Sequence, residues 1–298
     1  MFDRLITTLY INHRFYWWDE TTLAKHQQQR VAMILAYARE KSPYYRRLLL
    51  GQDKLSISYV PLIDKKEMMV HFDEINTACL RRDQLMEFRI EQERTGKLDL
   101  YRGEFSVGLS SGTSGNRGLT VLSKDEMERY SCLLWARSGI PRSVRRRRVL
   151  FALRTNNPAF MTVTSFGVKL VYVDYTHPIE ELIRLINREE LNILVGPPSL
   201  LTMIARHRAS IKQQIDGIVS YAEVLTDEGR SDLERAFNAP VAQIYQGAEG
   251  FIASTCQKGK MHLNEDIVLV ELEDAGDMIG NAKKLSLIHI SEPTRQAE

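Results

Sequence analysis

The sequence predicts an α/β fold in which helices pack on mixed sheets, and three observations carry that prediction. From about residue 97 onward, short apolar segments typical of strands alternate with amphipathic helical segments. Before that point the chain is rich in charge and helical in character. Soon after it, a loop rich in glycine, serine and threonine separates two strand-like pieces.

Composition limits the classes of function. The chain has 298 residues, of which 44% are hydrophobic and 26% charged, with a formal net charge of +2. That length suits one large domain or two small ones, and the near-neutral charge favours neither nucleic acid nor a membrane as partner. The cysteines, Cys79, Cys132 and Cys256, form no CxxC pair, which suits a reducing compartment without disulfides. No stretch approaches the ~18 apolar residues of a membrane span, so we expect a cytoplasmic protein.

The helical part begins with residues 22–40, where apolar residues recur at helical spacing from Val31 onward. Pro43 is expected to close this segment because proline does not continue a helix. Residues 64–95 are also helical in composition.

The alternating part begins at residue 149, and turn and cap signals separate its segments. Pro178 suits the first turn of one helix, and Thr226 is a plausible N-cap of another. A basic run at 142–148 is expected to be a solvated surface turn. The expected strands are 149–153, 169–175, 191–198, 217–221 and 241–246, and the expected helices are 177–190, 199–208 and 226–237.

The segment "SSGTSGNRG", residues 110–118, has the composition of an anion-binding loop. Glycines let the backbone approach a ligand closely, and hydroxyls add hydrogen-bond donors. A Walker-type P-loop is excluded, because the segment lacks the GK[ST] ending and does not run directly into a helix. The next helix begins at a capping box made by Ser123 and Glu126. We therefore predict a phosphate clamp between two strands, with a plain surface turn as the alternative.

This loop resembles the phosphate-binding loop of the adenylate-forming superfamily, which includes acyl-CoA synthetases, luciferases and nonribosomal-peptide adenylation domains. The family pattern is roughly [ST]-[SG]-G-T-[ST]-G-x-P-K-G. The loop of this chain is one residue shorter and lacks the Pro-Lys pair, so the resemblance implies that Arg117 supplies the cation. The residues implied to hold the β- and γ-phosphates are Ser110, Ser111, Gly112, Thr113, Ser114, Gly115 and Gly118.

A second segment, 219–250, resembles the family's adenine-binding strand and the Tyr-Gly-x-[Ser/Thr]-Glu motif that follows it. The resemblance implies that Ala222 and Glu223 contact adenine, that Tyr245 stacks on it, and that Glu249 binds Mg²⁺. An aromatic face suits a purine, and a carboxylate oxygen suits a hard cation.

The resemblance also has departures and open positions. Gln246 stands where the family has glycine, and Ala248 replaces a hydroxyl residue that touches the α-phosphate. The family's acyl pocket lies between the helix after the loop and the adenine strand. Trp135, Asn156 and Tyr221 are the candidates for it, with simple core packing as the alternative.

Within the superfamily, the chain resembles phenylacetate–CoA ligases and coenzyme F390 synthetases, on segments 31–49, 61–75 and 260–273. The resemblance implies one adenylation domain that is incomplete at its C-terminus. In it, residues 1–96 are a mainly helical N-terminal segment and 97–284 are the α/β ATP-binding core. Cys256 and His262 alone do not complete a tetrahedral metal site, so no structural metal is expected there.

Residues 285–298 resemble the in-frame translation of a transposase sequencing adapter, from Leu285 to Arg295. We therefore expect the natural polypeptide to break off near Lys284, and we exclude this tail from functional interpretation.

The function implied is activation of a small carboxylic acid by MgATP to an acyl-adenylate, usually followed by transfer to a thiol such as CoA. Because the final part of the domain is expected to be missing, the chain as written is expected to lack turnover. Two alternatives stay open: a catalytically inactive nucleotide-binding or interaction module, and a phosphate-binding protein that takes no nucleotide.

Overall fold

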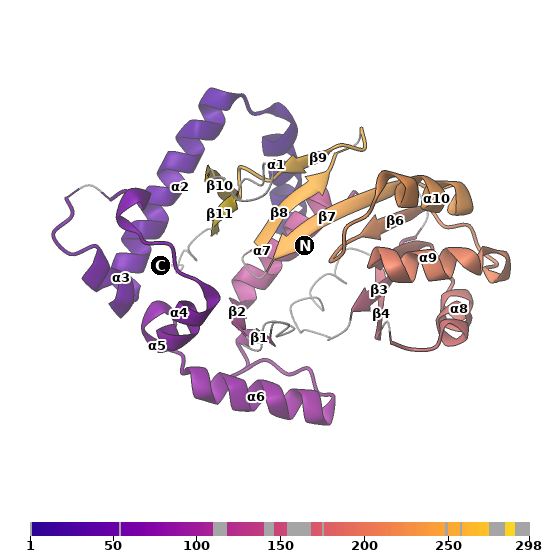
Figure 1. The fold of residues 1–298 in the computed structure, drawn as a ribbon, viewed down its shortest axis with the longest axis horizontal. Coiled ribbons are helices and arrows are strands. Elements are labelled where there is room, and N and C mark those ends of the chain that lie inside the picture. The colour runs from indigo at the N-terminus through magenta and orange to yellow at the C-terminus, as the bar shows by residue number, and fades with distance from the viewer. Residues whose placement is uncertain are drawn as a thin grey trace. The chain divides into compact units, whose positions relative to one another are not determined.

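Figure 1 presents the fold as a computed structural model. The structure describes residues 2–53, 55–109, 118–139, 146–153, 168–174, 176–247, 250–256, 258–273 and 284–289. Among these described residues, no helix combines the length and the apolar character that crossing a membrane requires.

The first part of the chain is helical, as its composition predicts, and side-chain caps determine where two of its helices begin. Asp19 accepts a hydrogen bond from the Thr22 N–H at 2.7 Å, and Ser42 accepts one from the Tyr45 N–H at 3.3 Å. Pro43 follows the predicted helix and also occupies the first turn of the next one. The helices of this part are α1 (Phe2–Trp17), α2 (Glu20–Lys41), α3 (Pro43–Leu48), η1 (Ile57–Tyr59), α4 (Lys65–Val70), α5 (Phe72–Ile75) and α6 (Arg82–Thr95).

An antiparallel pair of strands, β1 (Phe105–Leu109) and β2 (Leu119–Ser123), flanks the glycine-rich segment, as predicted. Leu109 pairs with Leu119, so residues 110–118 connect the two strands directly. The predicted capping box is also confirmed. Glu126 accepts a hydrogen bond from the Ser123 N–H at 2.8 Å, Ser123 Oγ accepts one from the Glu126 N–H at 3.3 Å, and α7 (Lys124–Arg137) begins there.

The alternating part forms a seven-stranded sheet in the order β4–β3–β5–β6–β7–β8–β9. The pairs from β4 to β7 are parallel, which the intervening helices make possible, whereas β8 and β9 are antiparallel. The predicted strands and helices are confirmed. The strands are β3 (Arg148–Leu153), β4 (Lys169–Asp174), β5 (Ile193–Gly196), β6 (Gly217–Ser220), β7 (Val241–Gly247), β8 (Gly250–Thr255) and β9 (Met261–Leu263), and the helices are α8 (Ile179–Arg188), α9 (Pro198–Arg206), η3 (Arg208–Ser210) and α10 (Asp227–Phe237).

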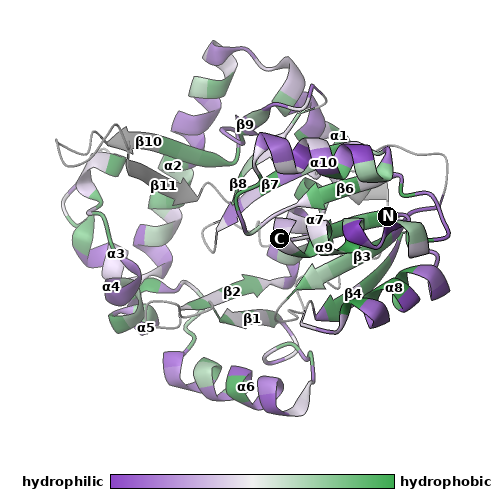
Figure 2. Ribbon diagram, turned by 45° about the vertical axis from the view of Figure 1, so that its right-hand side comes forward, coloured by the Kyte–Doolittle hydropathy of each residue, from purple (hydrophilic) through white to green (hydrophobic). Residues whose placement is uncertain are grey.

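The centre of this sheet is apolar, and Figure 2 colours β3 and β6 mostly as hydrophobic. Every residue of β5 and β6 is buried, as expected for parallel strands covered on both faces. Leu150, Leu194 and Ile218 join the buried residues of α8, α9 and α10 in one core cluster. This packing holds the carboxyl ends of the parallel strands in register.

The C-terminal segments contain short strands. The stretch 260–273 comprises β9, a turn at residues 265–267, and β10 (Val268–Glu273). β10 pairs in antiparallel fashion with β11 (Lys284–His289).

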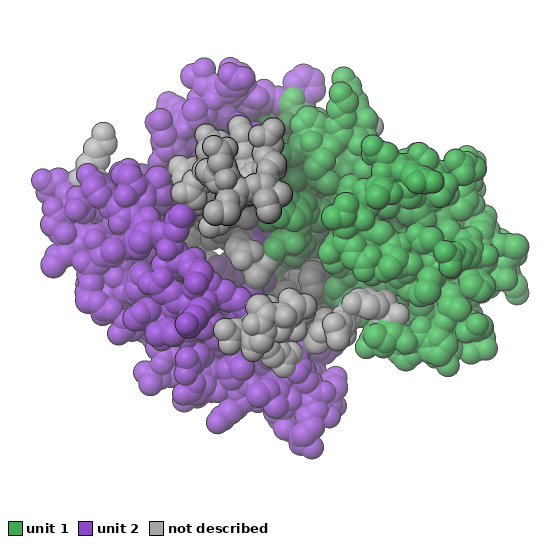
Figure 3. All heavy atoms as spheres, in the orientation of Figure 1, with its two compact units in different colours: residues 1–16, 127–247, 251–264 green, residues 17–126, 248–250, 265–298 purple. Residues whose placement is uncertain are grey.

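The described residues divide into two units, coloured in Figure 3. The sheet unit comprises residues 1–16, 127–247 and 251–264, and contains most of the seven-stranded sheet. The hairpin unit comprises residues 17–126, 248–250 and 265–298, and contains the β1–β2 hairpin.

The basic run at 142–148 is described from residue 146 onward. Arg147 is half-buried and lies over the Trp135 ring at 5.5 Å, and Arg148 pairs with Glu190 at 2.6 Å. These two arginines therefore stabilise the sheet unit, and are not part of a fully solvated turn as the sequence suggested.

Candidate functional site

The structure describes six of the predicted site residues: Gly118, Trp135, Tyr221, Ala222, Glu223 and Tyr245. The remaining predictions lie outside the described residues and stay predictions. They are Ser110, Ser111, Gly112, Thr113, Ser114, Gly115, Arg117, Asn156 and Glu249.

The predicted adenine residues gather at the carboxyl edge of the parallel sheet. Ser220, at the end of β6, pairs with Gln243 on the neighbouring strand β7. Tyr221 and Ala222 follow Ser220, and Tyr245 lies two residues beyond Gln243, so both segments emerge at the same edge. This edge of an open parallel sheet is where ligands bind in α/β proteins. The Tyr245 side chain is 50% exposed and leaves an aromatic surface there.

Ala222 has a backbone conformation that is unusual for a residue with a side chain. Its φ of 68° is left-handed, which costs roughly 1–2 kcal/mol for an L-residue. Its two neighbours hold it in place. The Tyr221 hydroxyl donates to the Ala152 carbonyl on β3, and the Glu223 carboxylate accepts from the Ser199 N–H at 3.1 Å and from Ser199 Oγ at 2.9 Å.

These contacts add a structural role for Glu223, and its adenine contact stays a prediction. Its carboxylate is occupied by Ser199 at the start of α9, so its described contact is to the protein. Glu223 therefore positions the 221–223 segment. The strained backbone between two such anchors is typical of functional segments.

Aromatic side chains cover one side of this edge. Phe151 on β3 pairs in register with Tyr172 on β4, and their rings meet edge to face at 5.5 Å. The Tyr221 ring stacks on Phe151 at 5.9 Å, with 16° between the planes. Tyr130 of α7 lies beside Gln246, near the end of β7. Strands β3 and β4, the segment after β6 and helix α7 thus place three tyrosines in one cluster.

Burial keeps two of these phenols neutral. It raises the pKa of Tyr130 well above its usual value, an effect that the neighbouring Gln246 side chain partly opposes. Burial also raises the pKa of Tyr172, and the proximity of Tyr130 and Tyr221 raises it further. Both groups are therefore hydrogen-bond donors, and neither is a base. Among the described residues, none accepts the hydrogen of the buried Tyr172 hydroxyl.

Trp135, a candidate for the acyl pocket, lies on α7 under Arg147. This contact gives the ring a packing role. Tyr221 is therefore the pocket candidate that the described contacts bring into the aromatic cluster.

The sequence analysis missed Phe151, Tyr172 and Tyr130. The alternation of β3 and β4 could have indicated the first two, because parallel strands in register place Phe151 beside Tyr172.

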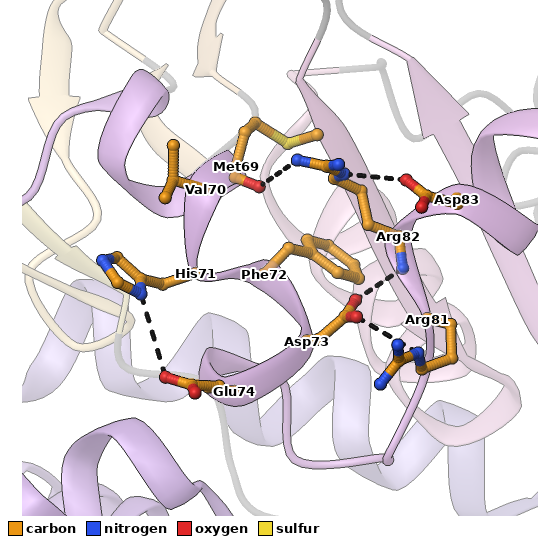
Figure 4. Close-up of a pocket in the computed structure, with 9 residues that line it drawn as sticks. All are labelled: Met69, Val70, His71, Phe72, Asp73, Glu74, Arg81, Arg82 and Asp83. Carbon is orange, nitrogen blue, oxygen red and sulfur yellow. Dashed lines mark hydrogen bonds and ion pairs between the residues drawn. The ribbon is translucent and has the colours of Figure 1, made fainter.

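The described residues line two surface hollows, and Tyr172 of the tyrosine cluster is among those that line the second. One, of about 360 Å³, belongs to the hairpin unit and is shown in Figure 4. Its charges are satisfied internally, since Arg81 pairs with Asp73 at 3.2 Å and Arg82 pairs with Asp83 at 3.1 Å. The other, of about 480 Å³, lies between β4 and α8 in the sheet unit. Within the part of the chain that the structure describes, no group of three or more His, Cys, Asp and Glu residues could hold a metal ion.

Comparison with known proteins addresses the fold. No protein-family model matches the sequence, and no curated protein matches it either. Among solved structures, an open form of 2-hydroxyisobutyryl-CoA ligase in complex with 2-HIB-AMP and CoA is similar, with a TM-score of 0.61 and 13% identity over 89% of this chain and 60% of that chain. The thioesterification state of the same ligase is similar at a TM-score of 0.64 and 13% identity, over 93% of this chain and 62% of that chain.

The chain therefore has the fold of an adenylate-forming acyl-CoA ligase domain, as the resemblance of its motifs implied. It spans about three-fifths of the length of the ligase structures cited above (60% and 62%).

Proposed function

We propose that this chain is part of an enzyme that activates a small carboxylic acid with ATP as an acyl-adenylate and passes the acyl group to a thiol. CoA is the acceptor we favour. The observation that supports this most is the shared fold, because the similar ligase structures are described as complexes with an acyl-AMP and with CoA. We place the chain in the phenylacetate–CoA ligase and coenzyme F390 synthetase branch on its sequence motifs.

In this proposal each site segment has one role. The loop Ser110–Gly118 binds the β- and γ-phosphates, and Arg117 neutralises their charge. Tyr245 and the left-handed Ala222 form the adenine contact, since an exposed aromatic ring suits a purine. Glu249 binds Mg²⁺. Attack of the carboxylate at the α-phosphorus then needs little beyond positioning and charge neutralisation.

The tyrosine cluster supports a proposal about the acid. Phe151 and Tyr221 offer stacked rings, and Tyr172 offers a buried donor that has no acceptor among the described residues. We infer an acid with a flat or aromatic body and an oxygen that accepts this hydrogen bond. An unsatisfied buried hydroxyl costs about 1–3 kcal/mol, and such a ligand would recover that cost.

The experiment that tests the proposed function is a screen of carboxylic acids for hydroxamate formation and for acid-dependent exchange of pyrophosphate into ATP. It uses the chain extended after Lys284 by the C-terminal part of a ligase of the same fold. Formation of an acyl hydroxamate with one class of acid supports the proposal. ATP binding without any acid-dependent exchange across the panel argues against it.

That second outcome would support a catalytically inactive nucleotide-binding module. Ala248 and the missing Pro-Lys pair favour this alternative, because both remove groups that the family uses on the phosphates. We also propose that the 298-residue chain by itself completes no turnover, since it spans about 60% of the length of the similar ligase. Acyl-AMP formation by that chain would contradict this point.

A further inference from the structure

Helix α4 lies against the start of β2, beside the residue that ends the glycine-rich segment. Lys65 and Met69 are one helical turn apart and therefore share a face of α4. Met69 Sδ accepts a hydrogen bond from the Leu119 N–H at 3.3 Å. The alkyl chain of Lys65 lies on Gly118, the residue before Leu119. This face of α4 therefore contacts the chain where the segment 110–118 joins β2.

The contact between Lys65 and Gly118 explains why glycine stands at position 118. A Cβ on Gly118 would lie 2.7 Å from Lys65 Cε, closer than two carbon atoms can pack. Gly118 is buried and has no left-handed φ, so backbone strain does not require glycine here. The missing side chain instead leaves room for the lysine to pass. The ammonium group is one bond beyond Cε, at the end of the loop.

The charge of Lys65 has no counter-ion within the described part of the chain. Among the described residues, no carboxylate pairs with it, although the side chain is half-buried. The acidic side chains nearest in sequence have other partners, since Asp64 accepts from the Glu67 N–H at 2.7 Å and Glu67 accepts from the Tyr44 hydroxyl at 3.5 Å. A lysine whose stem is held against the protein and whose charge has no carboxylate among the described residues is suited to binding an anionic ligand, and lysine commonly binds phosphate as a point charge.

We propose that Lys65 binds the polyphosphate tail of the nucleotide at the start of β2 and adds a second positive charge to that of Arg117. This inference rests on the proposed function and adds a residue to it from a helix that precedes the loop by about fifty positions. Gly118 is the second element of the arrangement, because its missing Cβ lets the lysine reach this place.

The test compares Lys65→Met with Lys66→Met, because Lys66 is the next residue of α4, carries the same charge and is exposed. Calorimetry on the 298-residue chain measures binding of tripolyphosphate and of MgATP at two salt concentrations. Lys65→Met should weaken binding of both probes about 10- to 100-fold, which is the range for a hydrogen bond to a charged group. Lys66→Met should change it less than about threefold and should keep the wild-type salt dependence.

Two further variants separate the charge from the fold. Lys65→Arg should recover most of the affinity, and Gly118→Ala should weaken binding by displacing the flexible end of Lys65. The thermal midpoint of each variant should stay close to that of the wild type.

If the wild type binds both probes and Lys65→Met binds like Lys66→Met, the role of Lys65 is overturned while the proposed function stands. If the wild type binds tripolyphosphate as tightly as MgATP, the nucleotide site is overturned and the role of Lys65 is judged from tripolyphosphate. If it binds neither probe, both proposals are overturned.

Discussion

The β1–β2 hairpin and the carboxyl edge of the parallel sheet are both proposed to bind the nucleotide, yet they are built in different ways. The hairpin is a local structure, closed by the pairing of Leu109 with Leu119 and supported from outside by α4. The sheet edge is assembled from strands that are far apart in the sequence, and Tyr221 donates across it to Ala152.

The two regions obtain their binding groups from different parts of the structure. At the sheet edge, the register of strand pairing and the alternation of side chains along each strand align the functional residues. The contacts that stabilise the fold therefore also position the site. At the hairpin, the backbone offers a loop, and a lysine from a separate helix brings charge to its end. Substitutions in each region distinguish these two ways of building a site.

The first prediction compares the cores behind the two regions. Leu194 in the sheet and Leu85 on α6 are both fully buried. Replacing either by alanine should lower the free energy of unfolding by about 2–5 kcal/mol, because each change leaves a cavity. Urea unfolding measures the size of the effect. Hydrogen exchange should show lost protection in β3–β6 for Leu194→Ala and in α6 and the hairpin for Leu85→Ala. An identical pattern for both variants would contradict the division into two units.

The second prediction concerns charge in the loop. Arg117→Ala should weaken MgATP binding by about 1.5–3 kcal/mol, the range for a charge-assisted hydrogen bond. Arg146→Ala, an exposed arginine at the sheet unit, is the control and should leave the affinity unchanged. If calorimetry gives equal MgATP affinities for the two variants, Arg117 does not bind the phosphates. Lys65 would then be the proposed cation at the loop.

The third prediction uses a matched pair of tyrosines at the sheet edge. Tyr172→Phe removes a buried hydroxyl that has no acceptor among the described residues, and should raise the free energy of unfolding by about 1–2 kcal/mol. Tyr221→Phe removes a hydroxyl that donates to the Ala152 carbonyl, and should lower the free energy of unfolding by about 0.5–1.5 kcal/mol. Effects of the same sign would show that the two hydroxyls do not differ in this way.

Tyr130 and Tyr172 carry a pH dependence. Because burial raises the folded-state pKa of both phenols, the stability that they contribute is complete below the unfolded pKa of about 10 and is lost as the pH rises above it. Stability should therefore fall more gradually above pH ~10 in Tyr130→Phe or Tyr172→Phe than in the wild type.

The smallest effect is expected at the strained residue of the sheet edge. Ala222→Gly should raise the free energy of unfolding by about 0.5–1 kcal/mol, because glycine adopts a left-handed φ without a steric cost. Asn238→Gly is the control, since Asn238 is also left-handed, with a φ of 48° at the end of α10, but asparagine tolerates that conformation. Ala222→Gly should therefore stabilise the chain more than Asn238→Gly does in thermal unfolding. The opposite order would argue against strain at Ala222.

The sequence by itself determined the elements and their order. The capping box of Ser123 and Glu126, the N-cap Thr226 and the apolar runs of β5 and β6 are local signals, so the segments they mark could be predicted without long-range contacts. The motif around Tyr245 could be recognised for the same reason, since its residues are neighbours in the chain.

Tertiary structure alone decided which distant side chains meet. Phe151 and Tyr172 meet Tyr221 because the strand order places β4, β3 and β6 in one sheet, and no local pattern determines that order. Glu223 also anchors its segment because α9 brings Ser199 to its carboxylate, a contact between residues 24 positions apart in the chain. Lys65 reaches Gly118 because α4 packs on β2. No local pattern marks this lysine, since its neighbours in space are set only when the chain has folded.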